Sequence, residues 1–169
     1  MSIKNLRAKM VVNLHKNHSK NGGGNYLDKT KVKAYFSAVG DEFPVVAVTK
    51  ALGIEPTNTY KKGDAIERPD NPNLVSTKIR YRKETDWTLS TGYQESYDIN
   101  NQLNVILKSL EGKTEQLKHL KEKYGLEFLF MVVIQVENNE SPAMYLQKVI
   151  IDFASSIQAE IHFDLYIFS

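Results

Sequence analysis

The segment LEFLFMVVIQV, residues 126–136, carries the strongest strand signal of this 169-residue chain. All its even positions are apolar, and the odd positions include Leu129, Met131 and Val133 between polar ends. A side-chain period of two is that of a β-strand, and apolar residues on both sides of its middle indicate burial on both faces. We therefore predict a central strand over residues 126–136.

The segments that follow predict a helix and a closing strand. Ser141-Pro142 is a typical N-cap and first-turn pair. Residues 160–168 alternate again between apolar and polar side chains. If the last two strands are parallel neighbours, the helix between them makes a right-handed crossover. The connection is the only evidence for that pairing, and an all-antiparallel sheet is the alternative. The helix should bury Leu146, Val149, Ile150, Phe153 and Ile157.

Two more helices are predicted before the central strand. Asp98 precedes apolar residues at helical spacing as an N-cap, and Thr114 opens a second helix that Gly125 ends. These elements indicate an α+β domain in which helices pack on the sheet.

The N-terminal half of the domain predicts shorter elements. Residues 32–39 alternate as a strand, and a short helix begins after Pro44 and ends at Gly53. Residues 55–76 predict a long loop, and residues 77–82 and 86–90 predict a hairpin. The predicted fold class is α+β, with a mixed, largely antiparallel sheet of about five strands in the order β-α-β-β-α-α-β-α-β.

Charge is divided unevenly along the chain. The formal net charge of +2 combines eight basic residues and one acidic residue in residues 1–33 with 14 basic and 19 acidic residues in residues 34–169. The two parts therefore carry +7 and −5. Residues 3–14 predict a short amphipathic helix, and the Gly-rich stretch 15–25 predicts a linker. We interpret residues 1–30 as a basic flexible tail and 31–169 as a single domain.

Composition excludes several classes of protein. The chain has no cysteine, so disulfides, thiolate metal sites and a cysteine nucleophile are ruled out. The longest apolar run, residues 128–134, has seven residues against the ~20 that cross a bilayer. No secretory signal is evident. We expect a cytoplasmic protein without a membrane span, a metal or another cofactor.

Four sequence blocks resemble one family. They are AYFSAVGDEF (34–43), LGIEPTNTYKKGD (52–64), DWTLST (86–91) and FDLYI (163–167). Together they resemble the bacterial family called domain of unknown function 4279, over residues 31–168. The resemblance implies a small α+β domain with no established activity and no catalytic residues to assign. Some members lie beside toxin systems, which implies an immunity-type role. The basic tail, the loop 65–76 and the Lys78/Arg80/Arg82 stripe depart from the family pattern.

The loop 57–64 is the main candidate for a ligand site. Hydroxyls, ammonium groups and the backbone amides near Gly63 can together hold an anion, and Trp87 would add a flat wall. The competing interpretation is ordinary turn chemistry, because Lys-Gly-Asp makes a tight turn. The candidate ligand-binding residues are Thr57, Thr59, Lys62, Gly63, Asp64, Arg80 and Trp87.

Three other groups are weaker candidates. Asp41 and Glu42 suit a metal or a general base, but helix capping is the favoured interpretation. His162 and Asp164 share the non-core face of the last strand, where a surface pair is favoured over a proton acceptor. Lys78, Arg80 and Arg82 form a basic stripe that only half meets the criteria for nucleic-acid binding.

Taken together, these features favour a non-enzymatic binding domain. The expected partner is a toxin-like protein whose basic surface complements the acidic domain. The first alternative is a small anionic ligand in the 57–64 loop beside Trp87. The second is weak nucleic-acid binding through the basic tail.

Overall fold

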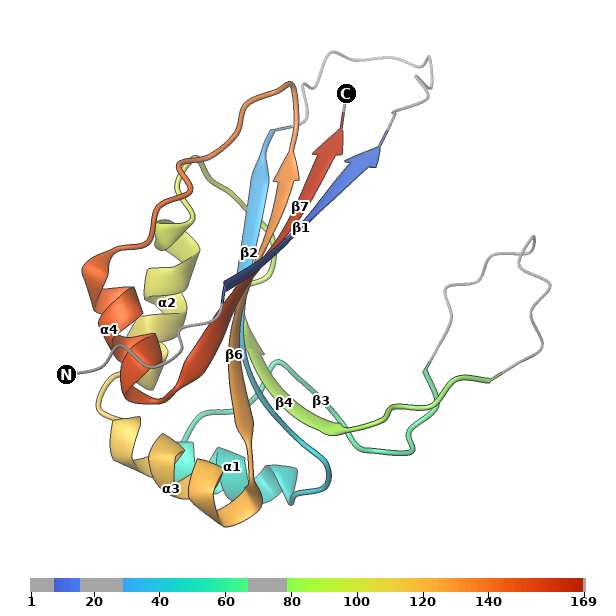
Figure 1. The fold of residues 1–169 in the computed structure, drawn as a ribbon, viewed down its shortest axis with the longest axis vertical. Coiled ribbons are helices and arrows are strands. Elements are labelled where there is room, and N and C mark those ends of the chain that lie inside the picture. The colour runs from blue at the N-terminus through green and yellow to red at the C-terminus, as the bar shows by residue number, and fades with distance from the viewer. Residues whose placement is uncertain (1–7, 16–28, 67–78, 169) are drawn as a thin grey trace.

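The computed structural model describes residues 8–15, 29–66 and 79–168, which form a single curved sheet with helices on one side (Figure 1). The described part contains seven strands and four helices. The elements are β1 (Ala8–His15), β2 (Lys31–Gly40), α1 (Val45–Leu52), β3 (Asn58–Tyr60), β4 (Thr85–Ser90), β5 (Gln94–Glu95), α2 (Asn100–Leu110), α3 (Thr114–Tyr124), β6 (Glu127–Val136), α4 (Lys148–Ser156) and β7 (Ala159–Phe168).

The strand order confirms the predicted α+β class and the central strand. The sheet runs β1-β7-β6-β2-β4-β3, and the short β5 also pairs with β2. β6 lies between β7, which is parallel to it, and β2, which is antiparallel. The all-antiparallel alternative is therefore wrong, and the sheet is mixed.

The helices cover the convex face of the sheet, and the core lies between the two layers (Figure 1). Val32, Ala34, Phe36 and Ala38 of β2 have no exposed surface. The even residues of β6 are buried beside them, as the period of two predicts. None of the described helices is long and apolar enough to cross a membrane.

Residues 8–15 form a strand, so the helix predicted over 3–14 is wrong in its described part. β1 pairs in parallel with β7 over eight residues, from Ala8 with Ile161 to His15 with Phe168. The backbone of β7 would otherwise present an unpaired edge, and a neighbouring strand satisfies it. Part of the segment interpreted as a tail thus belongs to the sheet. The Gly-rich stretch 16–28 lies outside the described residues.

The predicted hairpin of 77–82 with 86–90 is also wrong. β4 confirms the second strand, but residues 79–82 pair with another segment, through bonds that involve Ile66, Gly63 and Arg82. Their amides bond to the carbonyls of Arg80, Arg82 and Asp64 respectively, so residues 79–82 run beside 63–66. Residues 77–78 lie outside the described residues. The predicted loop 55–76 contains β3, which pairs with β4.

The last helix begins later than predicted. Ser141 and Pro142 lie outside any helix, and α4 starts only at Lys148. The amide of Ala143 donates to the Tyr97 carbonyl at 2.7 Å, and the Ile99 amide donates to the Ala143 carbonyl at 3.2 Å. These backbone bonds pair the segment with residues 97–99, and this pairing outweighs the local preference of Ser141-Pro142 to begin a helix. Ile150 and Ile157 are buried as expected, but Val149 is exposed.

Candidate functional site

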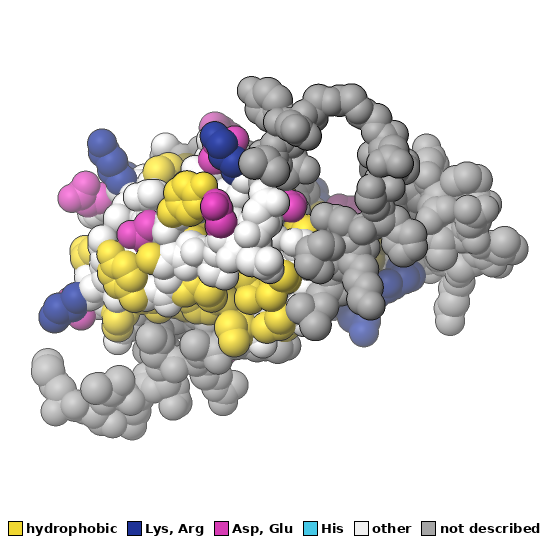
Figure 2. Space-filling view, turned by 90° about the horizontal axis from the view of Figure 1, so that it is seen from above, with side chains coloured by type: hydrophobic (Ala, Val, Ile, Leu, Met, Phe, Trp, Pro, Cys, Tyr) yellow, Lys and Arg dark blue, Asp and Glu magenta, His cyan; other side chains and the backbone are white. Residues whose placement is uncertain are grey.

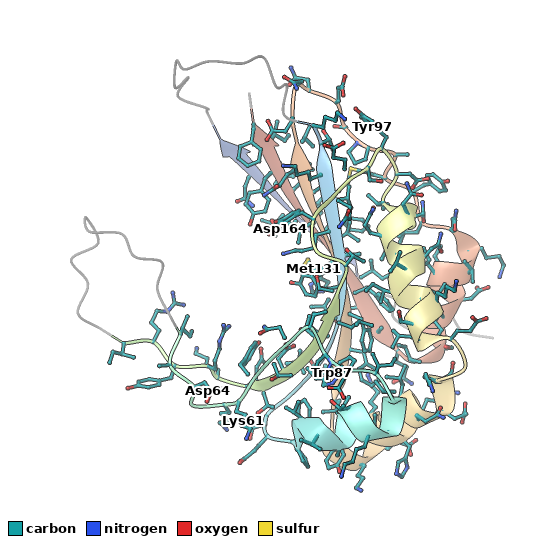
Figure 3. All side chains as sticks on the ribbon, turned by 180° about the vertical axis from the view of Figure 1, so that it is seen from behind. Lys61, Asp64, Trp87, Tyr97, Met131 and Asp164 are labelled. Atoms are coloured by element: carbon teal, nitrogen blue, oxygen red, sulfur yellow. The ribbon has the colours of Figure 1, made fainter. Side chains whose placement is uncertain are left out.

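The sheet curves away from the helices, so that its other side is concave (Figure 1). Tyr35 stands opposite Ser90 of β4 and Met131 of β6, and Met131 stands opposite His162 of β7. Directly paired residues point to the same side, so these four form one row. We call this side the concave face, and Figure 3 shows Met131 and Asp164 on it. Neighbouring rows add Lys33, Ser37, Asp86, Thr88, Leu129, Val133 and Asp164.

Asp86 is the buried charge of the concave face. It is 3% exposed, and among the described residues it is the one charged residue in the buried class. Its Oδ2 accepts a hydrogen bond from the Thr88 hydroxyl at 2.6 Å. The hydroxyl oxygens of Thr88 and Ser37 are also 2.6 Å apart. A chain of hydroxyls from β2 and β4 therefore ends on this carboxylate.

Among the described residues, Asp86 forms no direct ion pair, although the charge of Arg82 favours its ionised form. Burial raises the pKa of Asp86 above its usual value, and Glu84 adds to this, while the Thr88 and Ser37 hydrogen bonds and Arg82 oppose it. Burial thus makes ionisation of this carboxyl less favourable than ionisation of an exposed aspartate.

A hollow of about 370 Å³ opens above this carboxylate. Two cations lie on aromatic rings at its rim. The Arg82 guanidinium carbon is 4.0 Å from the centre of the Tyr60 ring, and Lys33 Nζ is 4.6 Å from the centre of the Tyr93 ring. Such contacts hold side chains in place before anything binds. The hollow is lined by Lys33, Tyr35, Ser37, Thr57, Asn58, Tyr60, Arg82, Asp86, Thr88 and Ser90.

The comparisons with known proteins assign a family but no activity. The family model described as domain of unknown function, DUF4279, matches residues 30–168. The chain belongs to this family. No curated protein and no solved structure matches it. The family resemblance seen in the sequence is therefore confirmed.

The 57–64 loop of the DUF4279 domain is built as a closed turn. The Lys61 amide donates to Asp64 Oδ2 at 2.7 Å, and the Lys62 amide donates to Thr85 Oγ1 at 3.2 Å. The amides of Gly63 and Asp64 donate to the carbonyls of Arg82 and Lys61. All four backbone donors are already used within the protein. The geometry agrees with the turn interpretation, because none of these four amides is left for an anion.

The side chains of the predicted site do not converge. Trp87 has no exposed surface and lies on the α1 side of the sheet, with its indole N–H donating to Thr49 Oγ1 at 3.0 Å (Figure 3). It therefore provides no wall for the loop. Lys62 forms an ion pair with Asp41. The side chains of Arg80 and Thr59 are exposed, and Thr57 lies at the edge of the Asp86 hollow. Of the predicted residues, only Thr57 lines that hollow.

A substitution at Gly63 tests how far this turn depends on backbone conformation. Gly63 has φ +89°, and nothing lies within 4 Å of an added Cβ. Gly63→Ala should therefore lower the free energy of unfolding by about 1–2 kcal/mol through backbone strain alone. Urea denaturation measures this. Lys61→Ala, at an exposed neighbour, should change it by less than about 0.5 kcal/mol. Equal effects of the two changes would contradict the strain argument.

Two of the weaker candidates are the Asp41–Glu42 pair and the His162–Asp164 pair. Helix α1 has no side-chain cap, so the capping interpretation of Asp41 and Glu42 is wrong. His162 Nε2 lies 2.7 Å from Glu160 Oε2, whereas Asp164 accepts hydrogen bonds from Asn13 and Tyr166. His162 and Asp164 are thus held by different neighbours. No group of three potential metal ligands occurs among the described side chains.

The basic stripe does not form a continuous surface in the described residues. Lys78 lies outside them, Arg80 is exposed, and Arg82 lies on the Tyr60 ring. In the view of Figure 2, basic and acidic side chains are interspersed rather than gathered by sign. The nucleic-acid interpretation therefore gains nothing from this arrangement.

The concave face was missed although the sequence carries its signal. In the stretch 86–89, Asp86 and Thr88 alternate with Trp87 and Leu89, and in 33–37 Lys33, Tyr35 and Ser37 alternate with apolar residues. The alternation placed the polar residues together on the face opposite Trp87. Trp87, which the sequence interpretation placed beside the 57–64 loop, lies on the opposite side of β4 from these polar residues.

Proposed function

We propose that this DUF4279 protein is a non-enzymatic binding domain that holds a protein partner on its concave face. The observation that supports this most is a broad sheet face that the described helices leave uncovered (Figure 1) and that tyrosines, Met131 and ring-stacked cations line (Figure 3). Tyrosine, methionine and arginine are enriched at protein interfaces.

The partner should be basic. Residues 34–169 carry a net charge of −5, and complementary charge speeds encounter and selects partners. A toxin with a basic surface is one partner of this kind, in keeping with the immunity-type role that the family resemblance suggests. The side chains of the rim are already held by their ring contacts, which lowers the entropy lost on binding.

The hydrogen bonds favour binding over catalysis. The hydroxyls of Ser37 and Thr88 lead to the Asp86 carboxylate. The one histidine on the face of β7, His162, pairs with Glu160. A nucleophile activated by a histidine base requires a direct contact between the two, and these contacts join other groups.

A capture experiment with matched variants tests the proposal. Met131→Asp places a charge at the centre of the concave face, and Val149→Asp places the same charge on exposed surface of α4. A basic protein captured from the native host should bind the wild type and Val149→Asp and bind Met131→Asp at least tenfold more weakly. Binding is then remeasured with the purified pair, and circular dichroism checks that both variants fold.

Two results would count against the concave face. One is a purified partner that binds Met131→Asp and the wild type equally. The other is a partner lost only with Val149→Asp, which would move the interface to the helices. Tyr93→Ala, at a residue 39% exposed, provides a second variant if Met131→Asp does not fold.

A further inference from the structure

The hollow on the concave face has a carboxylate as its floor. Asp86 is 3% exposed yet lines a space of about 370 Å³ that opens to solvent. Tyr60 stands opposite Asp86 in the pairing of β3 with β4, so its ring lies on the same side. Tyr35 lines the hollow from β2. The site therefore combines one buried negative group and two aromatic rings with the cations of Lys33 and Arg82 at its rim.

A buried carboxylate is stable as an anion when a cation or several hydrogen-bond donors offset the loss of water. Here the described residues supply hydroxyl donors but no ion pair. An incoming cation would form the direct ion pair that Arg82 and Lys33, at the rim of the hollow, do not form with Asp86. The tyrosine rings would contribute as well, since the negative faces of aromatic rings attract ammonium and guanidinium groups.

We propose that this hollow binds the guanidinium or ammonium head of a basic side chain of the partner, with Asp86 as its counter-ion and Tyr35 and Tyr60 beside it. That the cation belongs to a protein partner rests on the proposed function. The preference of the hollow for an organic cation does not, and it can be measured with a small molecule.

Arg82 acts as an internal competitor in this arrangement. Its guanidinium carbon lies 4.0 Å from the centre of the Tyr60 ring, where a ligand cation would also be attracted. It repels a second cation as well. Removing its charge should therefore strengthen cation binding, while at an anion site the same change would weaken binding.

Binding should depend on the ionisation of Asp86. Burial raises the pKa of this carboxyl, and the charged or titratable groups around it are Glu84, Arg82, Tyr35, Tyr60 and Lys33. Protonation makes the carboxyl neutral and removes its attraction for a cation. Affinity should thus fall as the pH drops through the raised pKa of Asp86. The tyrosines stay neutral in this range because burial raises their pKa values above the ordinary one.

The test titrates the full chain with N-acetyl-arginine amide and follows backbone amide shifts by NMR. N-acetyl-citrulline amide, which has nearly the same shape without the charge, is the matched control. We expect the arginine compound to shift the amides of Ser37, Tyr60 and Thr88 and the citrulline compound to bind at least tenfold more weakly. Asp86→Asn should lose at least tenfold in affinity, and Arg82→Gln should gain severalfold.

Three results would overturn the proposal. The first is equal binding of the arginine and citrulline compounds, and the second is unchanged binding of the arginine compound by folded Asp86→Asn. The third is weaker binding of the arginine compound by Arg82→Gln, together with shifts of the same amides by inorganic phosphate. The last would identify an anion site. If Asp86→Asn does not fold, two other measurements test the proposal. The affinity of the wild type for the arginine compound should fall with pH, and the Tyr60→Leu variant should bind that compound more weakly than the wild type. Failure here with a successful capture experiment would leave the proposed function standing.

Discussion

Trp87→Ala should lower the free energy of unfolding by about 3–5 kcal/mol, the range for removing a large aromatic side chain from a packed core. Trp87 is fully buried on β4 and meets Phe36 edge to face, with ring centres 6.5 Å apart. The substitution would leave a large cavity between the sheet and α1. It would also leave the Thr49 hydroxyl without the indole N–H that it now accepts.

Urea denaturation followed by far-ultraviolet circular dichroism measures this loss, because the variant lacks the chain's one tryptophan. Thr49→Val isolates the contribution of the indole hydrogen bond and should cost about 1–3 kcal/mol. Tyr81→Ala, at an exposed aromatic residue, should change stability by less than about 0.5 kcal/mol. A loss below 1 kcal/mol for Trp87→Ala would contradict the position of this side chain in the core.

Asn100→Ala should cost about 2–4 kcal/mol, because it leaves several polar groups without partners. Asn100 is buried at the start of α2. Its side-chain amide donates to Asp98 Oδ1 at 2.7 Å and to the Tyr145 carbonyl at 3.0 Å, and its Oδ1 accepts from the Gln147 amide at 3.1 Å. One side chain thus joins α2 to the segment before α4.

Tryptophan fluorescence during urea denaturation measures this effect. Asn101→Ala is the matched control, since this exposed neighbour makes one side-chain bond, to the Ser96 hydroxyl at 3.1 Å. It should cost less than about 1 kcal/mol. Asn100→Asp should be nearly as harmful as Asn100→Ala, because a carboxylate cannot donate to the Tyr145 carbonyl. Full stability of Asn100→Asp would show that this donor is unimportant.

Local sequence patterns predicted the elements whose apolar residues repeat at a clear period. The alternation over 126–136 and 32–39 gave two neighbouring strands of the sheet, and Gly53 and Gly125 end α1 and α3 in the left-handed conformation as expected. Those signals succeed because each depends on the residue's own face or its own φ angle.

The candidate site could be predicted much less well. The 57–64 loop carries many polar groups, but its amides are used by Asp64, Thr85, Lys61 and Arg82. Which donors are free depends on neighbours as far away as 23 positions in the sequence. The surroundings of Asp86 are formed by three strands. β2, β3 and β4 place Ser37, Tyr60 and Thr88 around it. No local pattern contains that arrangement.

The sequence alone determined the α+β class, the central position of residues 126–136 and the acidic character of residues 34–169. Each follows from composition or periodicity, which are properties of neighbouring residues. Only the tertiary structure decided that residues 8–15 join the sheet, that residues 141–147 stay outside any helix and that Asp86 forms the floor of an open hollow. These depend on backbone and side-chain hydrogen bonds between distant segments, whose free energy outweighs local helix and turn preferences.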